Sequence, residues 1–369
     1  MHIYSIVSII LLLMFILEQN SSLRVKNRLF YIAGFIVVSL LAFRGNDVGG
    51  DTIDYCGYFS GKGGTYGTFE LNDTFEIGFR VICWILIQVS RNDFWFLFST
   101  SLMTILPFIY LINRDCKSSK ILPLCLYMNV WAILSVTQTA IRQNISVSFF
   151  ILAYIIYTSN EVNLKKKIIS VLLLLVCGFF THTSSLVALP LVVIATLMPF
   201  NKRTAYIITL GSFALVMAFK NLFADIFNLF NSLMLNVEMA SHMLDVYYEN
   251  DRYALDSEVS FNRLGPATLL VCLLIWMSDD IDMKSPYLKF LVVGGALYNI
   301  GATFPMISRT VYALLFLGII YTPSNINKYK TKLSGILLIL LIAFFIRNQI
   351  VYLKPHQEDR MLPYTFIWE

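Results

Sequence analysis

A charged, glycine-rich segment at residues 43–59, FRGNDVGGDTIDYCGYF, directly follows an apolar run. Arg44 carries a planar guanidinium, which can bind a phosphate through two N–H groups. Asp51 or Asp47 could serve as a general base, since a dry site makes a carboxylate more basic. Flexible glycine backbone lets N–H groups approach an anion. The structural alternative is a tight turn in which Arg44 reaches the lipid headgroups and the aspartates cap a helix.

Three further positions place a polar side chain at the end of an apolar run. Arg142, followed by Gln143, opens a long apolar segment, and a buried arginine there would need an anionic partner. His182 lies between two apolar runs and could act as a general acid or base, or donate to a phosphate. Arg309 would add one more phosphate contact. The alternatives are interfacial arginines that reach the headgroups and a histidine that is merely hydrogen-bonded.

Two pairs of residues are weaker candidates. Glu76 and Arg80 are one helical turn apart, so we expect them to pair with each other. Tyr247 and Tyr248 lie in an acidic stretch between Glu238 and Glu258. Aromatic rings stack on sugar C–H faces and carboxylates accept from hydroxyls, so this stretch could contact carbohydrate. The alternative is an ordinary solvated loop.

The composition indicates what must hold these residues in place. Of the residues, 57% are hydrophobic and only 14% are charged, whereas soluble domains average about 25% charged residues. The apolar runs are longer and more continuous than the alternating strands of a membrane barrel. We therefore predict an all-α, polytopic integral membrane protein, a single membrane domain over residues 1–369 with about 12 or 13 hydrophobic helices.

Lysines and arginines in short hinges predict the orientation, because they concentrate on the cytoplasmic side. Four such hinges are expected there: Arg114–Lys120, Lys165–Lys167, Lys202–Arg203 and Lys328–Lys332. Positions 142, 182 and 309 then face outward, together with two longer loops over residues 44–74 and 220–263. The second loop begins with an amphipathic pattern that predicts a helix lying in the membrane interface. The net charge of +5 comes from these hinges and does not indicate nucleic-acid binding.

The N-terminal third does not fit strict alternation of spans. The basic residues at 24–28 favour the inside, which places the loop 44–74 outside; two further full spans would then put Arg114–Lys120 outside as well. The segment Phe75–Val89 has two charges in its first turns, so we expect it to be re-entrant or to lie in the interface. The alternative is that the first apolar run, Ile3–Leu17, is not a span.

In the motifs that contain these residues, the chain resembles the EpsG family, the Wzy-like polymerases of bacterial exopolysaccharide, capsule and O-antigen. Where that family usually shows V-G-T-D-T, this chain has V-G-G-D-T. The order of motifs and the hydropathy extend the resemblance over nearly the full length. The matching motifs are the FRG-x-x-x-G-G-D-T-x-x-Y block at Phe43–Tyr55, FEIGF at Phe75–Phe79, the span opening Ile141–Gln143, the His182–Thr183 pair and the Leu362–Tyr364 ending.

The resemblance implies a multi-pass glycosyltransferase of the bacterial cytoplasmic membrane that uses no nucleotide sugar. It would join oligosaccharide units carried on undecaprenyl diphosphate at the outer leaflet, moving the growing chain onto an incoming unit. No metal or other cofactor is expected, so arginines must stabilise the departing diphosphate. This role falls on Arg44, Arg142 and Arg309, with Asp51 or His182 as the base. Expected partners are the lipid-linked oligosaccharide, membrane lipids, a chain-length regulator and a flippase.

Three other functions stay open at this point. A flippase for the same lipid-linked unit would line a central cavity with its arginines, whereas here the polar residues gather toward one face. A membrane O-acyltransferase would need its histidine on the cytoplasmic side. A scaffold subunit of a polysaccharide complex would need no catalytic groups. Nucleotide hydrolysis is not expected, since the sequence has no Walker, Rossmann or HExxH motif, and the six cysteines lack metal-binding spacing.

Overall fold

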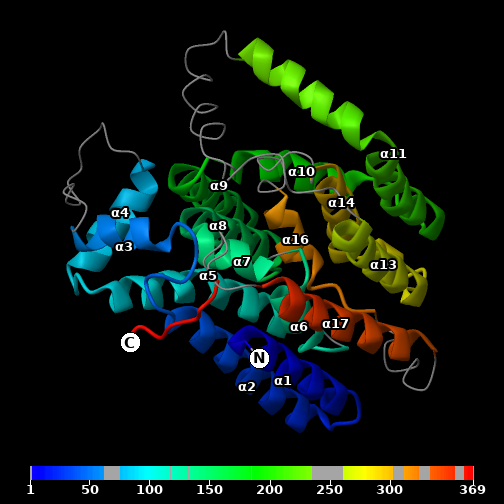
Figure 1. The fold of residues 1–369 in the computed structure, drawn as a ribbon, viewed down its shortest axis with the longest axis horizontal. Helices are drawn as coiled ribbons and strands as arrows, with labels where there is room; N and C mark the ends of the chain where they lie inside the picture. Colours follow the sequence, from blue (N-terminus) through cyan, green and yellow to red (C-terminus); the bar gives the residue numbers. More distant parts are fainter. Residues whose placement is uncertain are drawn as a thin grey trace.

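The computed structural model describes residues 2–61, 75–116, 118–131, 133–183, 185–234, 261–301, 311–323, 333–353 and 361–368. Within these ranges the chain forms fifteen α-helices and one short 3-10 helix (Figure 1). In chain order they are α1 (Ile3–Gln19), α2 (Leu23–Ala42), α3 (Thr52–Ser60), α4 (Ile77–Ile87), α5 (Asp93–Asp115), α6 (Leu122–Asn129), α7 (Ile133–Thr139), α8 (Ile141–Thr158), α9 (Leu164–Thr181), α10 (Ser185–Leu197), α11 (Lys202–Met234), α13 (Phe261–Met277), η2 (Asp282–Lys284), α14 (Pro286–Gly301), α16 (Tyr312–Gly318) and α17 (Leu333–Tyr352).

Several of the helices have the length and polarity of membrane spans. Among the described residues, α2, α5 and α17 are each long and apolar enough to cross a membrane, and the bent pair α7–α8 adds a fourth candidate. Large apolar side chains such as Phe35 and Leu17 point outward and are exposed, as expected where lipid covers the surface. These features confirm the predicted all-α, polytopic membrane fold.

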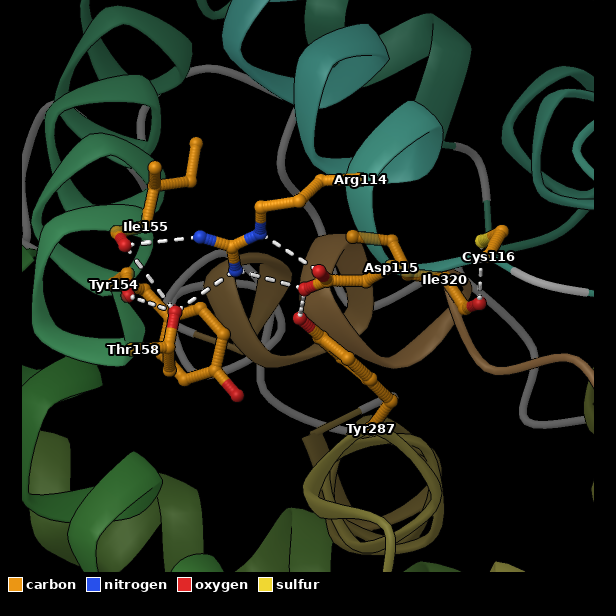
Figure 2. A network of polar contacts seen from close by, with 8 residues as sticks. All are labelled: Arg114, Asp115, Cys116, Tyr154, Ile155, Thr158, Tyr287 and Ile320. Atoms are coloured by element: carbon orange, nitrogen blue, oxygen red, sulfur yellow. Dashed lines mark hydrogen bonds and ion pairs between the residues drawn. The ribbon is translucent and has the colours of Figure 1, made fainter. Parts of the chain in front are cut away.

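The ends of the helices sort into two faces. At one face, which we call the loop face, α2 ends and α5 begins: the rings of Phe43 and Phe94 stack 5.9 Å apart. At the other face, which we call the basic face, Lys120 Nζ donates to Asn27 Oδ1 (3.0 Å) and Asn113 Oδ1 (2.7 Å), at the start of α2 and the end of α5. The C-terminal end of α8 also lies at the basic face, because Arg114 donates to Thr158 Oγ1 at 2.8 Å (Figure 2).

Helices α3 and α4 both lie at the loop face, at the left in Figure 1. Asn46, before α3, donates to Asp93 Oδ2 at 2.9 Å, and Asp93 comes directly after the α4 segment. The chain therefore leaves and returns to the same face between these two residues, and α4, with 11 residues, does not cross the bundle. This confirms the expectation that Phe75–Val89 is not a full span, and it removes the conflict in the charge pattern.

The run predicted as one span over Ile121–Ser135 is broken in the structure. It forms α6 and then α7, and Trp131 between them has φ 54°. The Trp131 carbonyl accepts a hydrogen bond from Tyr312 Oη at 3.2 Å, so a distant helix supports the break. Together α6 and α7 carry the chain from Lys120 at the basic face to Gln138 at the loop face.

The C-terminal segment returns to the loop face and packs on the Arg44 region. Gly45 N donates to Thr365 O (2.8 Å), and Ile367 N donates to Phe43 O (3.0 Å). A Cβ on Gly45 would lie 2.1 Å from Thr365 Oγ1, so a larger residue here would displace the Thr365 side chain. The N-terminal helix meets the C-terminal segment here: the ring centroids of Tyr4 and Tyr364 are 5.6 Å apart.

The amphipathic helix predicted from residue 220 is continuous with the preceding span. Helix α11 runs through Met234 and has a kink at Phe219 (φ −119°, ψ 24°). The chain thus changes direction where the amphipathic pattern begins, which agrees with the predicted start. The rest of the 220–263 loop, from 235 to 260, lies outside the described residues.

Candidate active site

The corner between α7 and α8 organises the candidate site. The two helices are bent by 114°, and Ala140 between them has non-helical dihedral angles (φ −96°, ψ 65°). In a continuous helix the Gln138 carbonyl would accept from the backbone N–H four residues later. At the corner it accepts instead from Thr52 Oγ1 (3.0 Å) and Arg44 Nη2 (3.3 Å). The bend thus joins the Arg44 segment to the start of α8.

Arg142, in the first turn of α8, is held by three neighbours from other segments. Its Nε donates to Tyr55 Oη at 3.2 Å, and its Nη1 forms an ion pair with the Glu76 carboxylate. The guanidinium carbon lies 4.6 Å from the centre of the Phe75 ring, which places the cation over an aromatic face. Tyr55 comes from α3, and Phe75 and Glu76 directly precede α4. The predicted anionic partner of Arg142 is therefore Glu76.

Glu76 also binds His182, at the C-terminal end of α9. Its Oε1 lies 2.8 Å from His182 Nδ1. Burial favours the protonated carboxyl, but the hydrogen bond from His182 and the charge of Arg142 outweigh it and hold the pKa of Glu76 below its ordinary value. Glu76 is therefore a carboxylate at neutral pH. When the His182 ring is neutral, it donates to this carboxylate from Nδ1.

Close helix packing brings these three residues together. A Cβ on Gly78 would lie 2.6 Å from the Phe180 carbonyl oxygen, so α4 can approach the end of α9 only because residue 78 is glycine. On the other side of α9, Ser146 Oγ of α8 donates to Gly178 O at 2.8 Å and to His182 O at 3.3 Å. These contacts fix the distance between the histidine and the start of α8.

The comparison with known families agrees with this geometry. The family model of the EpsG family matches residues 27–366, nearly the whole chain and every residue of the cluster. The chain belongs to the EpsG family. No curated protein and no solved structure matches it. Membership of the EpsG family and the membrane helices together indicate a membrane role in polysaccharide synthesis.

Arg44, in the FRG motif quoted for the EpsG resemblance, lies at the same corner but is enclosed. Its side chain is 1% exposed and donates to Leu41 O at 2.8 Å and to Gln138 O at 3.3 Å. Burial lowers the pKa of this guanidinium. Its donors reach backbone carbonyls of the corner, so the arrangement favours a role in positioning α8. The diphosphate contact predicted for Arg44 stays a prediction, and its burial does not support it.

The other candidates at the loop face take several positions. Asp51 is half-buried and directly precedes α3, four residues before Tyr55, whose hydroxyl contacts Arg142. Asp47 is exposed and accepts a hydrogen bond from Thr365 Oγ1 of the C-terminal segment. Gln143 is buried beside Arg142. The structure brings Asp51 closer to the cluster than Asp47, and neither assignment as a base is tested.

The expected pair of Glu76 and Arg80 does not form. Glu76 precedes α4, so its side chain is not on the helical surface that carries Arg80 one turn later. Both of its carboxylate oxygens bind residues of other helices, Arg142 and His182. Arg80 is buried within the α4 packing. Tertiary contacts, and not helical spacing, decide the partner of this carboxylate.

Three candidates lie outside the described residues: Arg309, Tyr247 and Tyr248. Their predicted roles stay predictions. Conversely, sequence reasoning did not select Tyr55, Phe75, Thr52 or Gln138 as site residues. Tyr55 and Phe75 belong to the motifs that carry the family resemblance, so their position in those motifs was a usable signal. Thr52 and Gln138 act through a backbone carbonyl, for which the sequence offers no signal.

Proposed function

We propose that this EpsG-family protein is a membrane glycosyltransferase that polymerises oligosaccharide units carried on undecaprenyl diphosphate, at the outer leaflet of the bacterial cytoplasmic membrane. The observation that carries this proposal is the cluster of Arg142, Glu76 and His182 at the loop face. It combines a cation for a phosphate leaving group, a carboxylate and a histidine that can take a proton, all near one bent helix pair. The product class is exopolysaccharide, capsule or O-antigen.

Arg142 is suited to a diphosphate because the described residues use only part of its hydrogen-bonding capacity. Among the described residues, its hydrogen bonds use Nε and Nη1, and a guanidinium has five N–H donors. Its Nη2 group therefore remains for a phosphate oxygen. The aromatic rings beneath it and the ion pair with Glu76 hold the guanidinium still, which lowers the cost of binding an anion.

An apolar groove lies along α8, near the cluster. It has a volume of about 320 Å³ and lies between α5 and α8. On α8 the positions 142, 145 and 149 are three and four residues apart, so they share one face of the helix. The groove thus begins one turn from Arg142 and offers a place for an isoprenoid chain whose diphosphate binds Arg142. Its lining residues are Leu102, Met103, Leu106, Pro107, Ile145, Ser148, Phe149 and Leu152.

The proposed reaction forms one bond and breaks one. A hydroxyl oxygen at the non-reducing end of the incoming unit attacks the anomeric carbon of the growing chain. The bond from that carbon to the diphosphate oxygen breaks, and the polyprenyl diphosphate leaves with the electron pair. Arg142 stabilises the negative charge that develops on it. The proton of the attacking hydroxyl passes to the imidazole of His182, while Glu76 holds the ring in position and stabilises the imidazolium that forms.

The proposal is tested with protein purified into lipid nanodiscs and supplied only with lipid-linked repeat units. Polymerisation gives a ladder of longer oligosaccharides on gels, without a nucleotide sugar. A flippase instead moves the lipid-linked unit across a liposome membrane and leaves its length unchanged. An O-acyltransferase requires an acyl donor and adds only the acyl mass. The proposal would be overturned if the folded wild-type protein gave no ladder but moved the lipid-linked unit across the liposome membrane.

A further inference from the structure

A second cavity lies away from the candidate active site, between α8, α9 and α10. It has a volume of about 440 Å³, which is in the range of sites that hold small ligands. Its lateral opening is formed by exposed apolar side chains of α10, among them Leu189, Val193 and Leu197. Because α8, α9 and α10 belong to the membrane bundle, this opening faces hydrocarbon. The lining residues are Phe150, Ala153, Tyr154, Tyr157, Thr158, Val171, Leu175, Leu189, Val192, Val193, Thr196, Leu197 and Pro286.

The polar end of the cavity lies at the basic face. Thr158, the last residue of α8, lines this end and accepts a hydrogen bond from Arg114 Nη2 (Figure 2). Thr196 lines it from α10, and its carbonyl accepts a hydrogen bond from Lys289 Nζ at 2.8 Å. The cavity is therefore amphipathic: its walls are mainly apolar, with aliphatic and aromatic side chains, and its end at the membrane surface is polar and lies beside Lys289.

Two lysines are placed to hold an anion at this end. Lys289 donates to the carbonyls of Thr196 and Met198, and its ammonium group has three N–H donors, so one remains for an anion. Lys167 is four residues before Val171 on α9, and Val171 is four before Leu175. Residues at this spacing share one face of a helix. Lys167 thus lies on the cavity-facing side, one turn closer to the membrane surface.

The charge around this end is positive. Three lysines, Lys165–Lys167, follow Glu161 at the α8–α9 hinge, and the first turn of α9 has no acidic residue. The carboxylate of Asp115 is neutralised locally, since both of its oxygens bind Arg114 and one also binds Tyr287. Cations near a membrane surface attract anionic lipid headgroups.

We propose that this cavity binds one anionic glycerophospholipid from the leaflet at the basic face. An acyl chain fills the space between α8, α9 and α10, and the phosphate lies between Lys167 and Lys289. This site lies at the end of α8 opposite to Arg142, so it is separate from the substrate site and does not depend on the proposed function.

The headgroup is tested by native mass spectrometry of the full-length protein, delipidated and then mixed with phosphatidylglycerol or phosphatidylcholine. We expect one phosphatidylglycerol to be retained and phosphatidylcholine to be lost. Lys167→Gln should lower retention about fivefold, as removal of one cation near a headgroup does. Lys166→Gln removes the same charge from a neighbouring, exposed position and should leave retention unchanged. Equal loss in the two variants, or equal retention of the two lipids, would overturn the proposal.

The acyl chain is tested at the opening of the cavity. Val193→Trp fills the opening, whereas Ile194→Trp adds the same volume at the next exposed position of α10, which does not line the cavity. We expect the first variant to lose the bound phosphatidylglycerol and the second to keep it, with both eluting as folded monodisperse protein. Competition with soluble glycerol phosphate separates a lipid site from a free phosphate site, because displacement of the lipid by glycerol phosphate alone would contradict the proposal.

Discussion

Two clusters of an arginine and a carboxylate lie at opposite ends of α5 and α8, one at each face. Their exposure is nearly the same. At the loop face the side chains of Arg142 and Glu76 are 21% and 22% exposed; at the basic face those of Arg114 and Asp115 are 25% and 21% exposed (Figure 2). Exposure therefore does not distinguish a site that could bind an anion from one that only holds helices together.

Hydrogen-bond donors do distinguish them. Arg114 uses four of its five N–H donors within the protein: Nε and Nη2 donate to Asp115, Nη1 donates to Ile155 O at 2.9 Å, and Nη2 also donates to Thr158. Its partners are a sequence neighbour and the end of α8, so the cluster joins two helices. Arg142 keeps donors for a ligand. The comparison teaches that the unused N–H groups of an arginine are a better guide to function than its location at a helix end.

The third member of each cluster differs as well. Tyr287 donates to the Asp115 carboxylate, and a phenol does not accept a proton at neutral pH. His182 is bound to the Glu76 carboxylate through Nδ1, and an imidazole ring can take and return a proton. Matched substitutions in the two clusters therefore distinguish a catalytic role from a role that only holds helices together.

Glu76→Gln should have the largest effect on catalysis. The amide keeps the shape of the side chain but removes the charge that orients His182 and pairs with Arg142. We expect the elongation rate to fall about 10³-fold, as for loss of an orienting carboxylate in a histidine-based site. The rate is measured with purified protein and lipid-linked units. Asp115→Asn is the matched control; it should stay within about twofold of wild type, and a comparable loss in both variants would contradict the comparison.

Arg142→Lys tests whether the geometry of the guanidinium matters beyond its charge. Lysine keeps the charge but cannot bind Tyr55, Glu76 and a phosphate at once in one plane. We expect kcat to fall about 10²-fold, with little change in KM, because the lost contact is made mainly to the leaving group. Arg114→Lys, in the cluster at the basic face, should change kcat by less than about threefold. A larger effect of the second variant would show that the wrong cluster has been assigned.

Much of this architecture could be predicted from the sequence, because apolar runs and basic hinges can be read directly from it. Continuous apolar runs predict membrane helices, and the conflict between Arg24–Arg28 and Arg114–Lys120 predicts that α4 does not cross. The first signal depends on residues close together in the chain, and the second on the order of basic hinges along it. Arg142 and His182 were found because each interrupts an apolar run. The structure places them together at one face, as the charge pattern predicted.

What could not be predicted depends on contacts between distant segments. The partner of Glu76 is decided by the approach of α4 to α9 at Gly78, and no spacing within α4 encodes it. The enclosure of Arg44 depends on the corner at Gln138 and on the C-terminal segment 361–368, far away in sequence. A motif therefore shows that Arg44 belongs to the site region but does not show which way its side chain points.

Arg44→Leu separates the two roles considered for this residue. If Arg44 positions α8, the change removes donors from two buried carbonyls and should lower the free energy of unfolding by about 1–3 kcal/mol. It should also lower kcat about tenfold through the displaced corner. A diphosphate contact predicts instead a raised KM with unchanged thermal stability in nanodiscs. Arg24→Leu, an exposed arginine at the basic face, is the control for the loss of charge.

The smallest effect expected is the dependence of stability on pH through Glu76. Its pKa in the folded protein lies below the ordinary value of 4.5. A lowered pKa means that the folded state binds the proton less readily than the unfolded state, so this carboxylate stabilises the fold at pH values above 4.5. That contribution is lost as the pH falls through the lowered pKa.

We therefore expect Tm of the wild type to exceed that of Glu76→Gln by about 2 °C at pH 7. The difference should persist at pH 5.5 and shrink below pH 4.5. A difference that grows on acidification would mean that the carboxylate is destabilising when ionised, and that Arg142 and His182 do not hold it in the folded protein.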